Sequence, residues 1–377
     1  MPDNRGKSFR DKLKPSPQKK LLAVDGGGIR GVISLEILLK IESILRGKTG
    51  NSGLVLSDYF DYVAGTSTGA IIATCVAMGM SVAEIRKFYL ESGPAMFTRA
   101  GILRRFQYKF EQDSLAEKLK QVLGADTKLG SETLETLLLL MMRNATTDSP
   151  WPISNNPGAK YNNMDRPDCN LRMPLWQLVR ASTAAPTYFP PELIPVGEHN
   201  FLFVDGGVTM YNNPAFQLFL MATVEPYNLN WPTGMDKLLL VSTGTGTSPK
   251  ANANLQPDDM NLLYNATSIP SALMFAALNE QDFLCRVFGD CLAGCALDRE
   301  VWDMKGKRGP AMPKLFTYMR YNAELTEEGL AQLGLADIKP EHVQALDSID
   351  HIAELQRVGQ AVSEKEVLDN HFDRFLI

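Results

Sequence analysis

The sequence contains few histidines and cysteines and no long apolar run. Of its 377 residues, four are histidine and five are cysteine, and no Cys-x-x-Cys pair occurs. An odd number of cysteines without framework spacing argues against a disulfide-stapled secreted protein. No run of 18 apolar residues and no apolar leader is present, so we expect neither a transmembrane helix nor a secretory signal. A cytoplasmic protein that contacts membranes only peripherally is expected.

No net positive charge is present outside the first 20 residues. The net charge is −5, which argues against the basic surface typical of nucleic-acid-binding proteins. Residues 1–20 are the exception, with seven basic side chains against two acidic ones. We expect a flexible basic arm that either aids solubility or leans on an anionic membrane. No oxygen-rich calcium loop occurs, and we expect no metal and no cofactor.

The pattern of apolar residues predicts an α/β fold. Expected strands lie at 21–24, 59–64, 201–204 and 237–241, and expected helices at 32–46, 70–80, 81–93 and 175–183. Residues 144–174, rich in Asn, Pro and Asp, are expected to be one long irregular loop, and the chain from about 257 onward is mostly helical in pattern. Strands that alternate with helices predict a mainly parallel sheet covered by helices on both faces.

A candidate nucleophile follows the second expected strand, in the segment Gly65-Thr-Ser67-Thr-Gly69. A Gly-x-Ser-x-Gly turn between a strand and a helix lifts the serine hydroxyl out of the sheet. The two glycines allow close backbone packing, and the helix N-terminus places partial positive charge beside the serine. The same residues also suit an ordinary helix N-cap, so the pattern alone is weak.

A glycine-rich segment follows the first expected strand and has two possible uses. Consecutive backbone N–H groups at a helix N-terminus suit either a phosphate or a developing oxyanion. The spacing formally matches a dinucleotide fingerprint, but a charged Arg30 lies within it and no acidic residue closes a second strand near position 50. Considered together with Ser67, an oxyanion loop is favoured for the segment Asp25-Gly26-Gly27-Gly28-Ile29-Arg30-Gly31.

A candidate base follows the strand at 201–204. Asp205 precedes Gly206 and Gly207 at the end of this apolar run. Ligands and catalytic groups collect where strands end, and a carboxylate at such an edge can accept the serine proton directly. The structural alternative is an aspartate that shapes a turn with its two glycines.

Together, these segments resemble the patatin-like phospholipase family. The ordered set is far more specific than any one motif, and it spreads over roughly half of the chain: Asp25-Gly-Gly-Gly-Ile-Arg-Gly31, Gly65-Thr-Ser-Thr-Gly69, Ala184-Ala-Pro-Thr-Tyr-Phe189, Asp205-Gly-Gly207 and Asn212-Asn-Pro214.

The resemblance implies a lipid acyl hydrolase with a three-layer α/β/α sandwich, acting on phospholipids or related acyl lipids in membranes or micelles. It implies Ser67 as nucleophile, Asp205 as proton acceptor, and Gly26, Gly27, Gly28 and Arg30 as the oxyanion loop. On this basis we expect a basic arm at 1–20, a catalytic core at 21–217, and at 218–377 the rest of the sheet with a mostly helical region packed on the core.

Two alternatives stay open. One is a general carboxylesterase with a Ser-His-Asp triad, which would need one of only four histidines beside Ser67: His199, His342, His351 or His371. The last three lie among charged residues and are expected at the surface. The other alternative is an effector whose phospholipase is inactive until a ligand or partner binds.

Three further patterns are given minor roles. Cys285, Cys291 and Cys295 lack the partners of a tetrahedral metal site and are expected to be buried core residues. The segment Ser242–Thr247 is expected to be a structural turn at the same sheet edge. Aromatic and basic residues at 96–97 and 104–110 suit either a membrane-facing lid or an amphipathic helix docked on the core.

Overall fold

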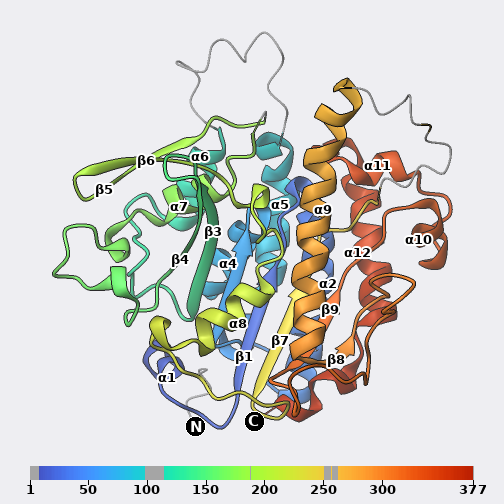
Figure 1. The fold of residues 1–377 in the computed structure, drawn as a ribbon, viewed down its shortest axis with the longest axis horizontal. Coiled ribbons are helices and arrows are strands. Elements are labelled where there is room, and N and C mark those ends of the chain that lie inside the picture. Colours follow the sequence, from blue (N-terminus) through green and yellow to red (C-terminus); the bar gives the residue numbers. More distant parts are fainter. Residues whose placement is uncertain (1–7, 98–113, 187, 250–255, 257–261, 377) are drawn as a thin grey trace.

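The computed structural model describes residues 8–97, 114–186, 188–249, 256 and 262–376 (Figure 1). Its centre is a nine-stranded sheet of order β5-β6-β3-β2-β1-β7-β9-β8, with β4 paired to β3 off this path. The strands are β1 (Lys19–Val24), β2 (Tyr62–Thr66), β3 (Leu137–Asn144), β4 (Ser149–Ser154), β5 (Glu192–Val196), β6 (His199–Asp205), β7 (Leu238–Thr243), β8 (Asp290–Ala293) and β9 (Thr317–Tyr321).

Most of the sheet is parallel, as predicted. Strands β3, β2, β1, β7, β9 and β8 run in parallel, while β4, β5 and β6 form antiparallel pairs. Every residue of β1, β2 and β7 is buried. Parallel strands covered on both faces read as continuous apolar runs because neither face meets water.

Helices cover both faces of the sheet, which gives the expected α/β/α sandwich. In β1, Leu22 and Val24 point into one apolar core, and Leu21 and Ala23 into the other. The first core is formed with α2 (Gly31–Thr49), α4 (Thr68–Ala77), α5 (Val82–Phe97), α6 (Ser114–Leu123), α7 (Leu175–Ser182) and α12 (Ile352–Glu366). The second is formed with α8 (Ala215–Thr223), α9 (Leu262–Phe288) and α1 (Phe9–Leu13). Short helices α3 (Leu56–Tyr59), α10 (Glu327–Gln332) and α11 (Pro340–Gln344) complete the fold.

The prediction of a flexible arm over residues 1–20 is wrong for residues 8–20. This stretch forms α1 and the start of β1, and the side chains of Lys12 and Lys19 are buried. The Lys19 ammonium lies 4.5 Å from the ring centroid of Trp231 and 3.8 Å from the Asp61 carboxylate. Long lysine stems pack against apolar surface while the charged end finds a partner, so a basic segment need not be disordered.

One other expectation about the chain's organisation needs correction. Residues 144–174 are not one irregular loop, because 149–154 form β4, which pairs with β3. Its two prolines argued against a strand, but β4 lies off the main path of the sheet, where missing ladder donors are tolerated. Beyond residue 257 the chain forms α9, α10, α11 and α12 together with two short strands, β8 and β9.

The turn from β2 into α4 allows no side chain at its final glycine. A Cβ at Gly69 would lie 2.2 Å from the Val24 carbonyl oxygen of β1, whereas one at Gly47 in α2 meets nothing within 4 Å. We therefore expect Gly69→Ala to destabilise the fold by about 3 kcal/mol through the backbone clash.

The matched control is Gly47→Ala, which should stabilise the fold by about 0.5–1 kcal/mol because alanine is the better helix former. Denaturant melts of both variants measure this. Equal stability of the two variants would show that α4 does not pack this tightly on β1.

Candidate active site

Ser67 lies in a strained turn between β2 and α4. Its backbone has φ 55° and ψ −123°, a conformation that is uncommon for a residue with a side chain. The Ser67 N–H donates to Ser182 Oγ at 3.0 Å, and Ser182 in turn donates to the Met141 carbonyl at 2.5 Å. The serine at the end of α7 therefore ties the strained turn to β3. Close packing is visible at Gly65, where a Cβ would lie 2.0 Å from the Gly69 carbonyl.

Asp205 reaches Ser67 because β6 approaches from the opposite direction to β2. Strand β2 ends where Thr66 pairs with Met141, and β6 pairs with the remaining part of β3, ending where Asp205 pairs with Met142. The two strand ends thus meet at neighbouring positions of β3. A Cβ on the next residue, Gly206, would lie 2.3 Å from the Met141 carbonyl, so only glycine allows this approach.

The hydroxyl and the carboxylate are in direct contact. Ser67 Oγ donates to Asp205 Oδ2 at 2.6 Å, and the Gly207 N–H donates to Oδ1 at 2.6 Å. Asp205 is 4% exposed, and this burial raises its pKa from 3.8 to about 6, although the bonds from Ser67 and Gly207 and the charge of Arg180 oppose the rise. The carboxylate is therefore a stronger base than an exposed aspartate and is still ionised at neutral pH.

The glycine loop packs directly against this pair. A Cβ at Gly26 would lie 3.2 Å from the Ser67 Cβ and 2.3 Å from Asn212 Oδ1. The Gly26 N–H donates to the Asn212 carbonyl at 3.1 Å. Gly28 has φ 59°, the left-handed region that favours glycine. In the part of the chain that the structure describes, no acceptor is found for the N–H groups of Gly27 and Gly28.

Arg30 lies at the end of the same loop and is half-buried. One guanidinium nitrogen donates to the Gln344 carbonyl at 3.1 Å, while its buried Nε has no partner among the described residues. Burial lowers the pKa of Arg30 to about 10, and the nearby Asp25 and Tyr188 oppose this. The side chain therefore remains a cation at neutral pH.

These groups share one cavity of 640 Å³. It brings together Ser67, Asp205, Gly207 and Arg30 with the three loop glycines, while Phe97, Phe189, Val208, Met274 and Leu346 supply much of the apolar wall. A nucleophile, a base and free amide donors in an apolar cavity can carry out acyl transfer on a hydrophobic ester. Phe97 is buried, and the aromatic segment at 104–110 lies outside the described residues.

None of the four histidines lies in this cavity, whose described lining residues include no imidazole. His199 begins β6 and lines a separate groove with Trp151 and Phe201. His371 shares a hydrogen bond with the Tyr321 hydroxyl at 2.8 Å. His342 and His351 contact Glu354 instead. The side chain that accepts the hydrogen bond of the Ser67 hydroxyl is a carboxylate, that of Asp205.

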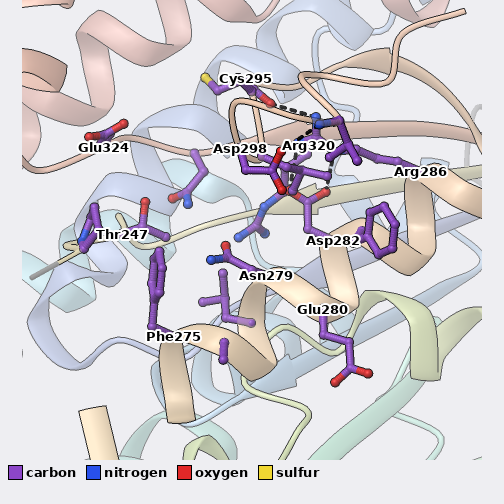
Figure 2. Close-up of a pocket in the computed structure, with 18 of the residues that line it drawn as sticks. Thr247, Phe275, Asn279, Glu280, Asp282, Arg286, Cys295, Asp298, Arg320 and Glu324 are labelled. Carbon is purple, nitrogen blue, oxygen red and sulfur yellow. Dashed lines mark hydrogen bonds and ion pairs between the residues drawn. The ribbon is translucent and has the colours of Figure 1, made fainter. Parts of the chain in front are cut away.

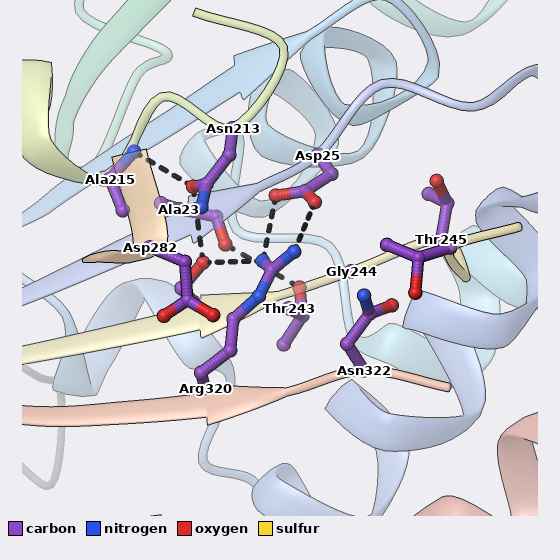
Figure 3. Close-up of polar contacts among 12 residues, drawn as sticks. Ala23, Asp25, Asn213, Ala215, Thr243, Gly244, Thr245, Asp282, Arg320 and Asn322 are labelled. Carbon is purple, nitrogen blue, oxygen red and sulfur yellow. Dashed lines mark hydrogen bonds and ion pairs between the residues drawn. The ribbon is translucent and has the colours of Figure 1, made fainter. Parts of the chain in front are cut away.

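A buried ion pair supports the glycine loop from below (Figure 3). Asp25, the first residue of the loop motif, accepts two bonds from Arg320 of β9, at 2.9 and 2.5 Å. Arg320 also donates to Ser242 Oγ at 2.7 Å, which donates to Asn213 Oδ1 at 3.3 Å. Both charged side chains are at most 2% exposed. Burial raises the pKa of Asp25, with Arg320 opposing it.

Sequence reasoning did not assign Arg320 or Ser182. For Arg320 a signal existed: an arginine inside the apolar run Thr-Tyr-Met-Arg-Tyr is buried only if it is paired. For Ser182 no signal existed, because its two bonds join segments that are distant in sequence. The turn after β7 has the structural role expected of it, since Thr245 Oγ1 donates to the Gly26 carbonyl at 2.7 Å.

Arg320 also borders a second cavity of 610 Å³, between α9 and β9 (Figure 2). Arg286 of α9 makes two bonds to Asp282 there, at 2.8 and 2.9 Å. Of the three cysteines near this region, Cys285 and Cys291 are buried as expected. Cys295 is exposed, so the prediction that it belongs to the core is wrong.

Replacing only one member of the Asp25–Arg320 ion pair should lower the free energy of unfolding more than replacing both members. We expect Arg320→Met to destabilise the protein by roughly 3–5 kcal/mol, because the Asp25 charge is left buried without a partner. Adding Asp25→Asn should restore much of that loss. Urea melts of both single variants and the double variant measure the coupling. Additive losses would contradict a direct interaction between the two side chains.

The chain is similar to known proteins over much of its length. The model of the Patatin-like phospholipase family matches residues 22–219. Patatin-T5 of Solanum tuberosum is 28% identical over 73% of this chain and 77% of its own length. The 85/88 kDa calcium-independent phospholipase A2 of Rattus norvegicus is 31% identical over 64% of this chain, which corresponds to 29% of its own length.

Among solved structures, human GIVD cytosolic phospholipase A2 in complex with methyl gamma-linolenyl fluorophosphonate superposes with a TM-score of 0.49 and 13% identity. The superposition covers 98% of this chain and 61% of that one. The matched family segment contains the glycine loop, Ser67 and Asp205. The chain belongs to the patatin-like phospholipase family, whose members are lipid acyl hydrolases.

Proposed function

We propose that this protein hydrolyses carboxylic esters of phospholipids or related acyl lipids through a Ser67–Asp205 dyad. The observation that carries the proposal is the 2.6 Å hydrogen bond from Ser67 Oγ to Asp205 Oδ2 inside an apolar cavity. The names of the similar proteins, a patatin and a phospholipase A2, support a lipid ester as the substrate.

The reaction proceeds in two steps. Asp205 takes the Ser67 proton as Oγ attacks the ester carbonyl carbon, and collapse of the tetrahedral intermediate expels the alcohol with that proton and leaves an acyl-enzyme. Water then attacks the acyl-enzyme, again losing its proton to Asp205, which restores the serine and releases the fatty acid. The raised pKa of Asp205 suits this role, since a base works best when its pKa approaches the working pH.

Two amides of the glycine loop are the proposed oxyanion donors. The Gly26 N–H donates to the Asn212 carbonyl and is therefore not available to an oxyanion. The N–H groups of Gly27 and Gly28 have no acceptor among the described residues. Arg30 adds positive charge at the cavity wall. One oxyanion donor typically contributes about 10²–10³ in turnover, so these amides carry a large part of the rate.

The substrate reaches the site from a lipid surface by peripheral contact. No helix within the described residues is long and apolar enough to cross a bilayer. The apolar wall residues, including Phe97 and Met274, suit an acyl chain that leaves the lipid phase. Binding to a membrane and release of free fatty acid are therefore both expected of the purified protein.

Removing either member of the dyad should abolish hydrolysis without unfolding the protein. We expect Ser67→Ala and Asp205→Asn each to lower kcat at least about 10³-fold, as loss of a triad member does in other serine hydrolases. Fatty acid released from a mixed lipid extract, identified by mass spectrometry, is the readout. The control replaces all four histidines by glutamine, which should leave most of the activity. Activity that survives Asp205→Asn but is lost in Ser67→Ala and in the histidine variant would favour a triad.

The pKa of Asp205 predicts opposite effects of pH on activity and stability. Activity should fall as pH drops through about 6, because the protonated carboxyl cannot accept the serine proton. Stability has the other sign: the folded pKa is raised above 3.8, so stability from this group is fully present below pH 3.8 and is lost as pH rises through about 6.

Asp205→Asn should therefore be more stable than the wild type at pH 8, by up to about 3 kcal/mol, and the gain should vanish toward pH 4. Thermal melts at pH 4, 6 and 8 measure it. A stability gain that is the same at every pH would contradict the raised pKa.

A further inference from the structure

Two histidines and a glutamate converge on one point outside the catalytic cavity. His342 lies on α11, His351 ends the 3-10 turn Ile349–His351, and Glu354 lies in the first turn of α12. Nδ1 of each imidazole lies 3.0 Å from the same carboxylate oxygen, Oε2 of Glu354. Their side chains are 27–34% exposed, so an ion from solvent can reach them.

Two of the three separations among these atoms are close to those between ligands of one metal ion. Ligands about 2.0–2.1 Å from a tetrahedral Zn²⁺ lie about 3.3 Å from one another, close to the observed contacts. The two imidazole rings are stacked, with centroids 3.9 Å apart and planes 14° apart, so binding of one ion requires a ring to rotate until both Nδ1 lone pairs point at it. One potential ligand atom from each residue lies within 4.8 Å of the other two.

The donor set also selects the kind of ion. Imidazole with one carboxylate suits Zn²⁺, Co²⁺ or Ni²⁺, whereas Ca²⁺ and Mg²⁺ require more oxygen ligands. Three protein ligands leave one position of a tetrahedral shell for water. The alternative is a hydrogen-bonded cluster in which both imidazoles donate to Glu354, and the experiment below distinguishes the two.

The chain between these ligands touches the catalytic loop. The Gln344 carbonyl accepts a bond from Arg30 at 3.1 Å, and the Leu346 carbonyl accepts the Ile29 N–H at 3.0 Å. Leu346 also lines the catalytic cavity. Any restraint that holds α11 against α12 therefore restrains the segment against which the glycine loop packs.

We propose that His342, His351 and Glu354 bind a divalent transition-metal ion, and that the bound ion fixes residues 344–346 against the glycine loop. Because an ion that binds the folded state alone stabilises it, the site links metal concentration to the rigidity of the oxyanion loop. The ion takes no part in the ester chemistry, since none of its ligands lines the catalytic cavity.

The first test is binding of Co²⁺ and Zn²⁺ to the full chain after treatment with a chelator. We expect one ion per chain, with the visible absorption of tetrahedral Co²⁺ and a melting temperature that rises with metal concentration. His342→Gln, His351→Gln and Glu354→Gln should each lose these signals, and His199→Gln, on β6, should keep them. No binding, or binding unchanged in all three ligand variants, would overturn the site.

The second test follows the Ile29 amide by hydrogen exchange, which reports its bond to Leu346 without relying on activity. Zn²⁺ should slow exchange in the peptide that contains Ile29 roughly ten-fold in the wild type and not in His342→Gln. Unchanged exchange with the ion bound would overturn the coupling to the loop. Esterase activity without metal should be the same in wild type and His342→Gln, so failure here is distinguishable from failure of the proposed hydrolase.

Discussion

The hydrogen bond between Ser67 and Asp205 depends on two strands that meet end to end on the flank of a third. Strand β3 is longer than its parallel neighbour β2, and the antiparallel β6 pairs with the part that β2 leaves free. Both strands stop at adjacent residues, Met141 and Met142, so the hydroxyl and the carboxylate are 138 residues apart in sequence and 2.6 Å apart in space. The contact between Ser67 and Asp205 thus follows from the length and direction of the strands.

Burial of charge is the cost of this arrangement, and the fold offsets it locally. Asp205 has a donor on each carboxylate oxygen. The Asp25 carboxylate accepts hydrogen bonds from two guanidinium nitrogens of the buried Arg320. This ion pair holds the start of the glycine loop against β7 and β9. Buried charges persist only where paired in this way. At the glycine loop, the N–H groups of Gly27 and Gly28 have no acceptor among the described residues, whereas both oxygens of Asp205 accept hydrogen bonds.

Much of this could be predicted from the sequence, because the decisive signals are local. The turn motifs predict that glycine is needed at positions 65, 69 and 206. In the structure, a Cβ at any of these positions would lie within 2.3 Å of a backbone carbonyl oxygen. The apolar runs before Ser67 and Asp205 predict that both lie at strand ends. The alternation of strands and helices predicts the sandwich.

The features that the sequence does not predict depend on contacts between residues far apart in the chain. The basic composition of residues 8–20 favours a flexible arm, because the ring of Trp231, on which the Lys19 ammonium packs, is more than 200 residues away in sequence. The prolines of β4 concealed a strand whose position off the main path tolerates them. Only the fold brings together the partners of Arg320, Ser182 and the two histidines that contact Glu354. A charged residue within a buried run is the one such signal that sequence alone could have used.

The most direct test of the central claim is the rate at which a fluorophosphonate labels the active site. Mass spectrometry of the digested protein should place one adduct on Ser67, and labelling should slow about 100-fold in Asp205→Asn, because the hydroxyl loses the base that activates it. An adduct on another residue, or labelling of Asp205→Asn at the wild-type rate, would contradict the account.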